Sequence, residues 1–133
     1  MRMHDRSLHI LVIDPNRMRA SIIEEGLREA GHDDVVLLTD MSNLMRQVVD
    51  ADPDVIIMDL ENPNRDVLEH ALQVSRAARR PIAMFVDKTD AAATEAAIDA
   101  GVSAYVVDGL KKERVKPILD MAIKRFNVIE RMR

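Results

Sequence analysis

Five short runs of apolar residues recur along the chain, separated by longer segments in which apolar and polar positions alternate. The runs are rich in Val and Ile and nearly free of polar residues, and they cover 8–13, 35–38, 55–58, 82–86 and 104–107. Runs of this length and composition are typical of parallel strands that are buried on both faces. We therefore predict five buried strands.

The segments between the runs carry apolar residues three or four positions apart, which predicts helices. The expected helices cover 18–30, 42–51, 65–77, 89–100 and 112 to the end of the chain. Gly31 and Gly101 follow the first and fourth of them, as is common just beyond a helix C-terminus. Pro117 falls inside the last helix and is tolerated only if that helix begins close before it.

The strand and helix signals alternate five times, which predicts an α/β fold. Connections of this length are right-handed crossovers and place helices on both sides of one parallel sheet. We expect a flavodoxin-like doubly wound sheet of five parallel strands in the order 2-1-3-4-5, with five helices. The 133 residues suit a single domain, and no linker, repeat or low-complexity tract divides 1–133.

Composition removes several function classes. A net charge of −4 and only three aromatic residues argue against a nucleic-acid surface on this domain. The absence of cysteine excludes disulfides, thiolate catalysis and cysteine metal sites. No signal peptide or long apolar run is seen, so we expect a cytoplasmic protein without membrane contact. Four glycines and no Gly-x-Ser-x-Gly sequence exclude a phosphate-binding loop and a hydrolase elbow.

Aspartates follow the strands at the positions where ligands bind in this architecture. They are Asp14, Asp40, Asp59, Asp87 and Asp108. The carboxyl ends of parallel strands share one edge, so Asp14 and Asp59 flank the switch point if strands 1 and 3 are neighbours. Clustered carboxylates repel unless a proton or a hard cation intervenes, which makes this a candidate Mg²⁺ site. Each aspartate could instead cap a helix or a turn, the interpretation we favour for Asp40.

Three segments resemble the receiver domains of two-component response regulators, the CheY-like family. They are 12–14, 59–66 and 101–107, and the match runs through essentially the whole chain. The resemblance implies that Asp59 is the phosphoacceptor and that Asp14, Asp59 and the backbone of Glu61 hold Mg²⁺. It also implies a conformational switch at Tyr105 and at Val86, although permanent packing of the Tyr105 ring in the core is an equal alternative.

Three residues depart from the pattern of that family. Pro15 stands where a second acidic residue is usual, Val86 replaces a hydroxyl residue, and Asp108 replaces a lysine. Each change removes a group that would hold the metal or the phosphoryl oxygens, so we expect degenerate phosphorylation chemistry. Asp87 could replace the missing acid, and Lys88 or Lys111 could approach the site in place of the missing lysine.

A narrower resemblance points to the antitermination regulators of the ANTAR class, in particular the NasT-like regulators of nitrate and nitrite assimilation. It rests on 81–87, 101–110 and 117–122. It implies an RNA-binding domain after residue 133, reached through the helix over about 112–133. The implied partners are a sensor protein or histidine kinase and RNA through that further domain. A homodimer through helix 4, strand 5 and helix 5 is a third expectation.

We therefore interpret the chain as a signal-receiving module and not as an enzyme. The first alternative is an ordinary phospho-receiver, standing alone or controlling a DNA-binding output. A Mg²⁺-dependent phosphatase with an aspartyl nucleophile is a weaker alternative. The residues 59–61 read Asp-Leu-Glu where that class needs Asp-x-Asp, and the chain is too short for a cap domain.

Overall fold

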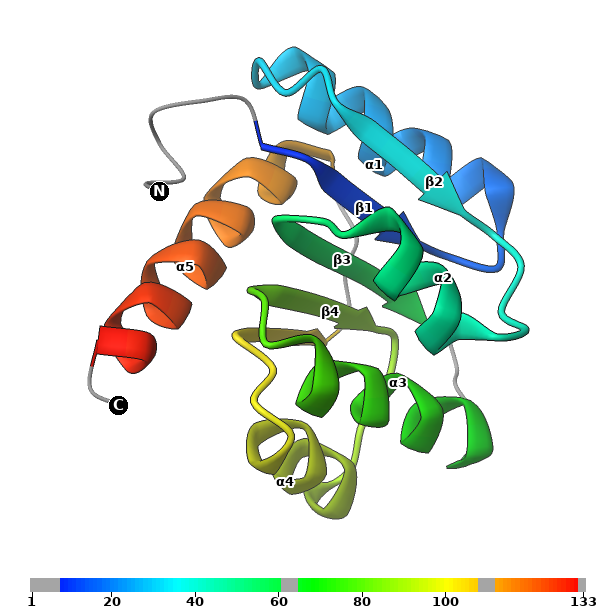
Figure 1. Cartoon of the computed structure of the whole chain (residues 1–133), viewed down its shortest axis with the longest axis vertical. Coiled ribbons are helices and arrows are strands. Elements are labelled where there is room, and N and C mark those ends of the chain that lie inside the picture. Colours follow the sequence, from blue (N-terminus) through cyan, green and yellow to red (C-terminus); the bar gives the residue numbers. More distant parts are fainter. Residues whose placement is uncertain (1–7, 61–64, 108–111, 132–133) are drawn as a thin grey trace.

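The five predicted strands form a single parallel sheet. The computed structural model describes residues 8–60, 65–107 and 112–131. The strands are β1 (Ile10–Ile13), β2 (Val35–Leu38), β3 (Val55–Leu60), β4 (Ile82–Val86) and β5 (Ala104–Val107). They lie in the order β2-β1-β3-β4-β5, and every neighbouring pair is parallel (Figure 1). The predicted doubly wound topology is confirmed.

A helix follows each strand, as predicted. The helices are α1 (Arg17–Glu29), α2 (Leu44–Ala51), α3 (Arg65–Ala78), α4 (Ala91–Asp99) and α5 (Lys112–Arg131). The ends of the elements differ from the prediction by two residues or fewer. The shift that matters is in β3, which continues to Leu60, so Asp59 lies inside the strand and pairs with Phe85 of β4.

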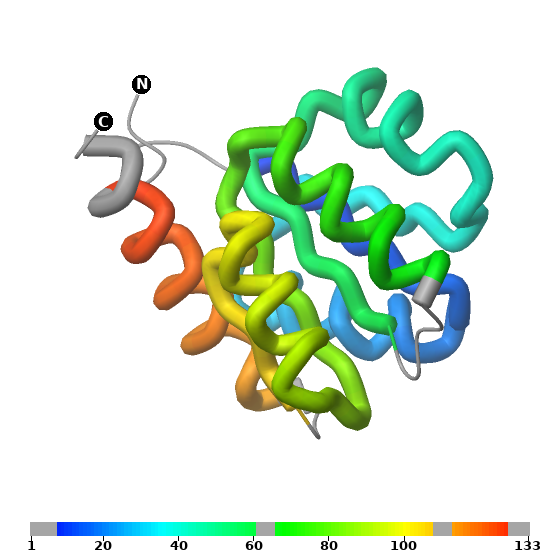
Figure 2. The backbone as a smooth tube through the Cα atoms, turned by 90° about the horizontal axis from the view of Figure 1, so that it is seen from below, coloured from blue at the N-terminus to red at the C-terminus, as the bar shows by residue number. Residues whose placement is uncertain are grey.

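The two faces of the sheet are covered by different helices. On one face, α1 and α5 pack over strand residues such as Val12, Ile57 and Phe85. On the other face, α2, α3 and α4 pack over residues such as Met58 and Met84. The tube in Figure 2 shows α3 and α4 side by side. Both faces are therefore buried, which explains why the strands are almost purely apolar.

The alternation of side chains along the strands determines on which side of the sheet Asp14 and Asp59 lie. Side chains of successive strand residues point to opposite faces, so residues two apart share a face. Asp14 follows Val12 by two positions, and Asp59 follows Ile57 by two. Since Val12 and Ile57 pack under α1 and α5, both aspartates belong to that side of the sheet, at its carboxyl edge.

Several local expectations are also settled. Gly31 and Gly101 have φ of 98° and 84°, the left-handed conformation expected after a helix. Val49 of α2 is apolar but lies outside the core, since it is 65% exposed. Pro117 lies beyond the first turn of α5, because that helix begins at Lys112. Within the described residues, no helix is long and apolar enough to cross a membrane.

Candidate functional site

The carboxylates of Asp14 and Asp59 converge at the carboxyl edge of β1 and β3, as predicted. Both residues are buried, with relative exposures of 0% and 4%. Their strands are hydrogen-bonded neighbours, which places the two residues at the switch point of the sheet. Asp14 Oδ1 also accepts a hydrogen bond of 2.8 Å from the backbone N–H of Asn16, which turns the chain into α1.

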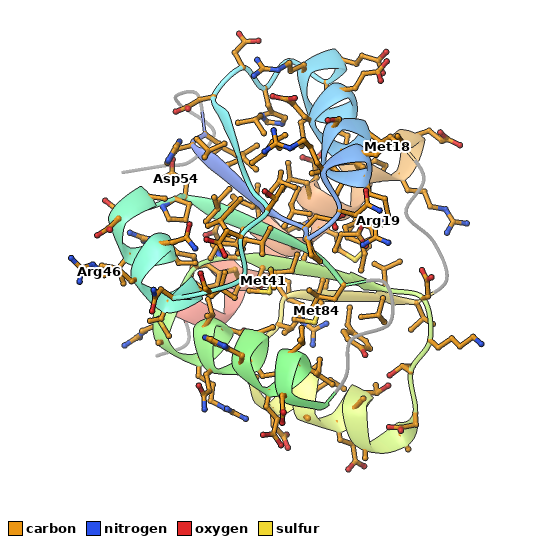
Figure 3. All side chains as sticks on the ribbon, turned by 90° about the vertical axis from the view of Figure 1, so that its right-hand side faces the viewer. Met18, Arg19, Met41, Arg46, Asp54 and Met84 are labelled. Atoms are coloured by element: carbon orange, nitrogen blue, oxygen red, sulfur yellow. The ribbon has the colours of Figure 1, made fainter. Side chains whose placement is uncertain are left out.

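Arg19, in the first turn of α1, holds both carboxylates. Its Nη2 lies 2.9 Å from Asp14 Oδ1, and its Nε lies 3.2 Å from Asp14 Oδ2. The same Nε is 3.3 Å from Asp59 Oδ2. Figure 3 shows Arg19 beside Met18 at this end of α1. We call these three residues, Asp14, Arg19 and Asp59, the acidic-site cluster.

The start of α1 fixes the backbone of Arg19. The Asn16 side chain accepts hydrogen bonds from the N–H groups of Met18 and Arg19, at 2.9 and 3.1 Å. This is a normal N-cap, and it satisfies two donors that the helix itself cannot pair. The guanidinium is therefore presented from an anchored helix start, directly beside the strand that carries Asp14.

The surroundings of Asp59 oppose its ionised form. Burial, a hydrogen bond with Asp14 and the charge of Asp14 raise the pKa of Asp59 to about 8, and nearby Asp87 adds to the effect. Arg19 acts in the opposite direction on the same pKa. Asp59 Oδ2 is buried without a hydrogen-bond partner among the described residues, so its contact with Arg19 is a poorly aligned ion pair. The arrangement favours the protonated form of Asp59 near neutral pH.

Carboxylate oxygens are suitable Mg²⁺ ligands, but here they already face a cation. The guanidinium contacts both oxygens of Asp14 and one of Asp59. Glu61, the third expected ligand, lies outside the described residues, and exposed Pro15 has no ligating side chain. Among the described residues no three side chains of ligating type gather. As folded, this chain's residues therefore fit Mg²⁺ poorly, because Arg19 takes the place of the ion.

The other predicted residues lie around this cluster without joining it. Val86 is buried in the core under α2, α3 and α4, and it brings no hydroxyl to the site. Asp87 is exposed and near enough to influence Asp59. Lys88 is exposed, and no ion pair within the described part of the chain joins it to the two aspartates. Asp108 and Lys111 lie outside the described residues.

Asp40 serves as a turn residue, which confirms the interpretation favoured for it. Its Oδ1 accepts hydrogen bonds from the N–H and the hydroxyl of Ser42, at 3.0 and 2.7 Å. These bonds lower the pKa of the Asp40 carboxyl. The residue is exposed and takes no part in the acidic-site cluster.

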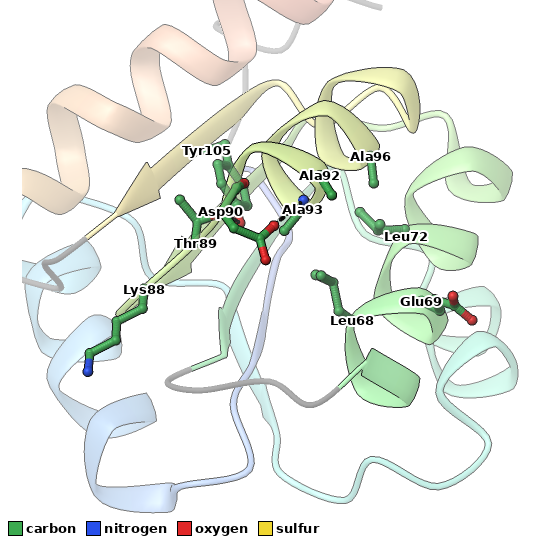
Figure 4. A pocket seen from close by; sticks show the side chains of 10 residues that line it. All are labelled: Leu68, Glu69, Leu72, Lys88, Thr89, Asp90, Ala92, Ala93, Ala96 and Tyr105. Atoms are coloured by element: carbon green, nitrogen blue, oxygen red, sulfur yellow. Dashed lines mark hydrogen bonds between the residues drawn. The ribbon is translucent and has the colours of Figure 1, made fainter.

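Tyr105 lies at the side of α4 that faces α3. Its ring is half-buried against the core, and its hydroxyl lies 2.9 Å from Thr89 Oγ1, which in turn lies 3.1 Å from Thr94 Oγ1. The residue borders a pocket of about 750 Å³ (Figure 4). Its lining includes Leu68, Leu72, Thr89, Ala93, Ala96 and Tyr105. The hydroxyl partner is therefore Thr89 of the β4–α4 loop, three residues beyond Val86.

Sequence reasoning missed Arg19. A signal was present, since a cation in the first turn of a helix opposes the helix dipole and needs a local reason. The first turn of α1 contains no acidic residue but does contain Arg19, five residues after Asp14. This spacing permits an ion pair with Asp14, but Arg17 lies in the same turn, so the sequence alone does not select Arg19.

Residues 10–120 match the family model described as the response regulator receiver domain. The chain belongs to this family. Receiver domains are signalling domains, and the strand order and the paired aspartates at the β1–β3 edge agree with that membership.

Two curated relatives illustrate the range of proteins that carry this domain. The transcriptional regulatory protein PdtaR of Mycobacterium tuberculosis is 27% identical over 120 residues, covering 90% of this chain and 58% of PdtaR. The protein-glutamate methylesterase/protein-glutamine glutaminase of Halobacterium salinarum is 33% identical over 93 residues, or 68% of this chain and 27% of that protein. The chain thus spans a little over half of PdtaR and about a quarter of the methylesterase.

Solved structures agree on the fold. The signal receiver domain of a modulated diguanylate cyclase from Desulfovibrio desulfuricans G20 superposes with a TM-score of 0.76 at 18% identity, covering 93% of this chain and 99% of that one. A CheY-like receiver domain protein from Methanospirillum hungatei JF-1 gives 0.74 at 12% identity, covering 96% and 100%.

Proposed function

We propose that this receiver domain controls an attached RNA-binding antitermination domain and that its phosphorylation chemistry is degenerate. The observation that carries the second part is the acidic-site cluster, in which Arg19 pairs with the carboxylates that would bind Mg²⁺. In this proposal Asp59 is the phosphoacceptor position, and Asp14, Asp59 and the backbone of Glu61 form a weakened metal site.

The chemistry explains why the departures matter. Phosphoryl transfer to a carboxylate builds negative charge on the transferring oxygens, and bound Mg²⁺ supplies neutralising charge in receiver domains. Here Val86 offers no hydroxyl donor, and Asp108 adds an anion where the family has a cation. Asp59 prefers its protonated form, in which it is a poor nucleophile. These properties favour control by binding of a sensor protein over control by phosphoryl transfer.

The partners follow from the family and from the exposed surface. Receiver domains interact with histidine kinases, and we propose a sensor protein or kinase as the input partner. Exposed apolar side chains on α4, β5 and α5 support a homodimer through that face; they are Ile98, Val107 and Met121. We also propose that α5 continues into the output domain and that RNA contacts only that domain. The match to a transcriptional regulator over 58% of its length supports such an arrangement.

Chemical labelling tests the proposal. The purified chain is incubated with acetyl phosphate and Mg²⁺, and its intact mass is followed beside that of a conventional receiver domain and of Asp59→Asn. Losing one well-placed donor slows such reactions by about 10²–10³-fold, so we expect labelling slower than the conventional domain by at least about that factor. Rapid stoichiometric labelling that disappears in Asp59→Asn would instead support an ordinary phospho-receiver, the alternative that the converging carboxylates favour.

The output is tested separately on the full gene product. We expect a compact helical segment after α5 that binds RNA, with a sensor protein that binds the receiver domain and changes this affinity. A downstream segment that binds duplex DNA and ignores RNA would contradict the antitermination proposal and leave the receiver assignment intact.

A further inference from the structure

We propose that Arg19 is the resident cation of the Asp14–Asp59 pair and competes with divalent metal ions for this site. The inference deepens the proposed function, since it rests on these two carboxylates being the receiver site. It assigns the weakness of the metal site to one residue of α1, in addition to the missing acidic residue at Pro15.

The guanidinium of Arg19 contacts the same carboxylate oxygens that a divalent metal ion would use. A guanidinium presents its donors in a planar fork that matches a carboxylate, and Arg19 uses Nε and Nη2 in this way on Asp14, at 3.2 and 2.9 Å. Its Nε also reaches Asp59 Oδ2 at 3.3 Å. A metal ion that bridges Asp14 and Asp59 needs oxygens from both carboxylates. The guanidinium already faces one oxygen of Asp59 and both of Asp14, so the ion has to displace it.

Burial strengthens this competition. The side chains of Asp14 and Asp59 are 0% and 5% exposed, and that of Arg19 is 20% exposed. Charges in such a position are screened little by salt, so a retained guanidinium repels an approaching dication over several ångströms.

Hydrogen bonds at the start of α1 also hold the backbone of Arg19. Asn16 caps the Arg19 N–H, and the next residue, Ala20, is fully buried and donates its N–H to the carbonyl of Asn16. Asn16 in turn donates its own N–H to Asp14. Moving the guanidinium away from the carboxylates therefore requires a new side-chain rotamer, since the helix start is tied to the end of β1.

Mn²⁺ binding, used as a paramagnetic substitute for Mg²⁺, tests the inference without any phosphoryl transfer. Free Mn²⁺ is measured by electron paramagnetic resonance in titrations of the unaltered chain, Arg19→Gln and Arg17→Gln. Arg17 is exposed in the same helix turn, so its variant removes the same charge without touching the carboxylates. We expect Arg19→Gln to bind Mn²⁺ at least about tenfold more tightly than the unaltered chain, and Arg17→Gln to change little.

The location and the fold of the variant are checked in the same samples. Mn²⁺ should broaden the amide NMR signals around Asp14 and Asp59 in Arg19→Gln. If the variant is unfolded without metal, Mn²⁺ should refold it, because binding to the folded state alone stabilises that state. Three results would overturn the inference. The first is equal Mn²⁺ affinity in all three proteins, and the second is an increase in affinity in Arg17→Gln as large as that in Arg19→Gln. The third is an unfolded Arg19→Gln that Mn²⁺ does not refold. Rapid labelling by acetyl phosphate would contradict the proposed function without deciding this result.

Discussion

At the scale of single residues, Asp59 lies in an environment that opposes its ionised form. It lies inside the buried strand β3, beside the carboxyl group of Asp14, and both carboxyl groups contact Arg19. An aspartate in these surroundings keeps its proton at pH values where an exposed aspartate has lost it, and its pKa of about 8 lies well above the ordinary value of 3.8. Folding therefore takes up a proton at Asp59 over the range between those two values.

This proton uptake predicts a pH dependence of stability. Between about pH 4 and pH 8 the folded state binds a proton that the unfolded chain releases, so the free energy of unfolding falls as pH rises. We expect a loss on the order of a few kcal/mol across that range, measured by urea unfolding in the presence of a chelator. Asp59→Asn should flatten the curve, whereas Asp50→Asn, at an exposed position of α2, should leave its slope intact. Parallel curves for all three proteins would show that Asp59 is ionised in the folded state.

The hydroxyl pair of Tyr105 and Thr89 gives a second residue-scale prediction. Their oxygens lie 2.9 Å apart at the edge of the α3–α4 pocket, so the two hydroxyls should stabilise the fold jointly. In a double-mutant cycle of Tyr105→Phe and Thr89→Val, we expect a coupling of about 0.5–1.5 kcal/mol in the free energy of unfolding. Strictly additive effects would indicate that the pair does not form in solution and that the ring is held by packing alone.

At the scale of elements, the start of α1 links helix stability to the acidic site. Asn16 caps the helix and also donates its N–H to Asp14. Asn16→Ala should lower the free energy of unfolding by about 1 kcal/mol, measured by urea titration. Asn16→Ser, which retains an N-cap oxygen, should recover most of the loss. If serine and alanine destabilise equally, the cap bonds of Asn16 contribute nothing measurable.

The elements themselves were predictable because their signals are local. Buried parallel strands must be apolar on both faces, and helices that pack on them must be apolar on one, so β4 and β5 were predicted to the residue. The end of β3 was placed too early because Asp59 was taken as a strand terminus. Ladder pairing with Phe85 continues through that position, and no local propensity of aspartate indicates it.

At the scale of the whole molecule, the sheet order brings Asp14 and Asp59 together from positions 45 residues apart. The topology was inferable from crossover rules, and so the convergence of these carboxylates was predictable. The role of Arg19 was not predicted, because it depends on the rotamer of a long side chain and not on the backbone path. The strand that carries Tyr105 was predicted correctly. The hydrogen-bond partner of its hydroxyl was not predicted, because that partner, Thr89, lies in a loop.

We conclude that the chain has an intact receiver fold, in which Arg19 already neutralises the charge of the carboxylate pair at the site. The most direct measurement is an amide NMR titration of the chain with beryllofluoride, an analogue of a phosphoryl group on aspartate, in millimolar Mg²⁺. Beryllofluoride needs an ionised acceptor, a bound metal ion and hydrogen-bond donors for its fluorine atoms. This site meets all three requirements poorly. We predict that the signals of Asp59, β4, β5 and α4 keep their positions throughout the titration. A second set of signals that grows with beryllofluoride and reaches Tyr105 would contradict the account and show a working phospho-receiver.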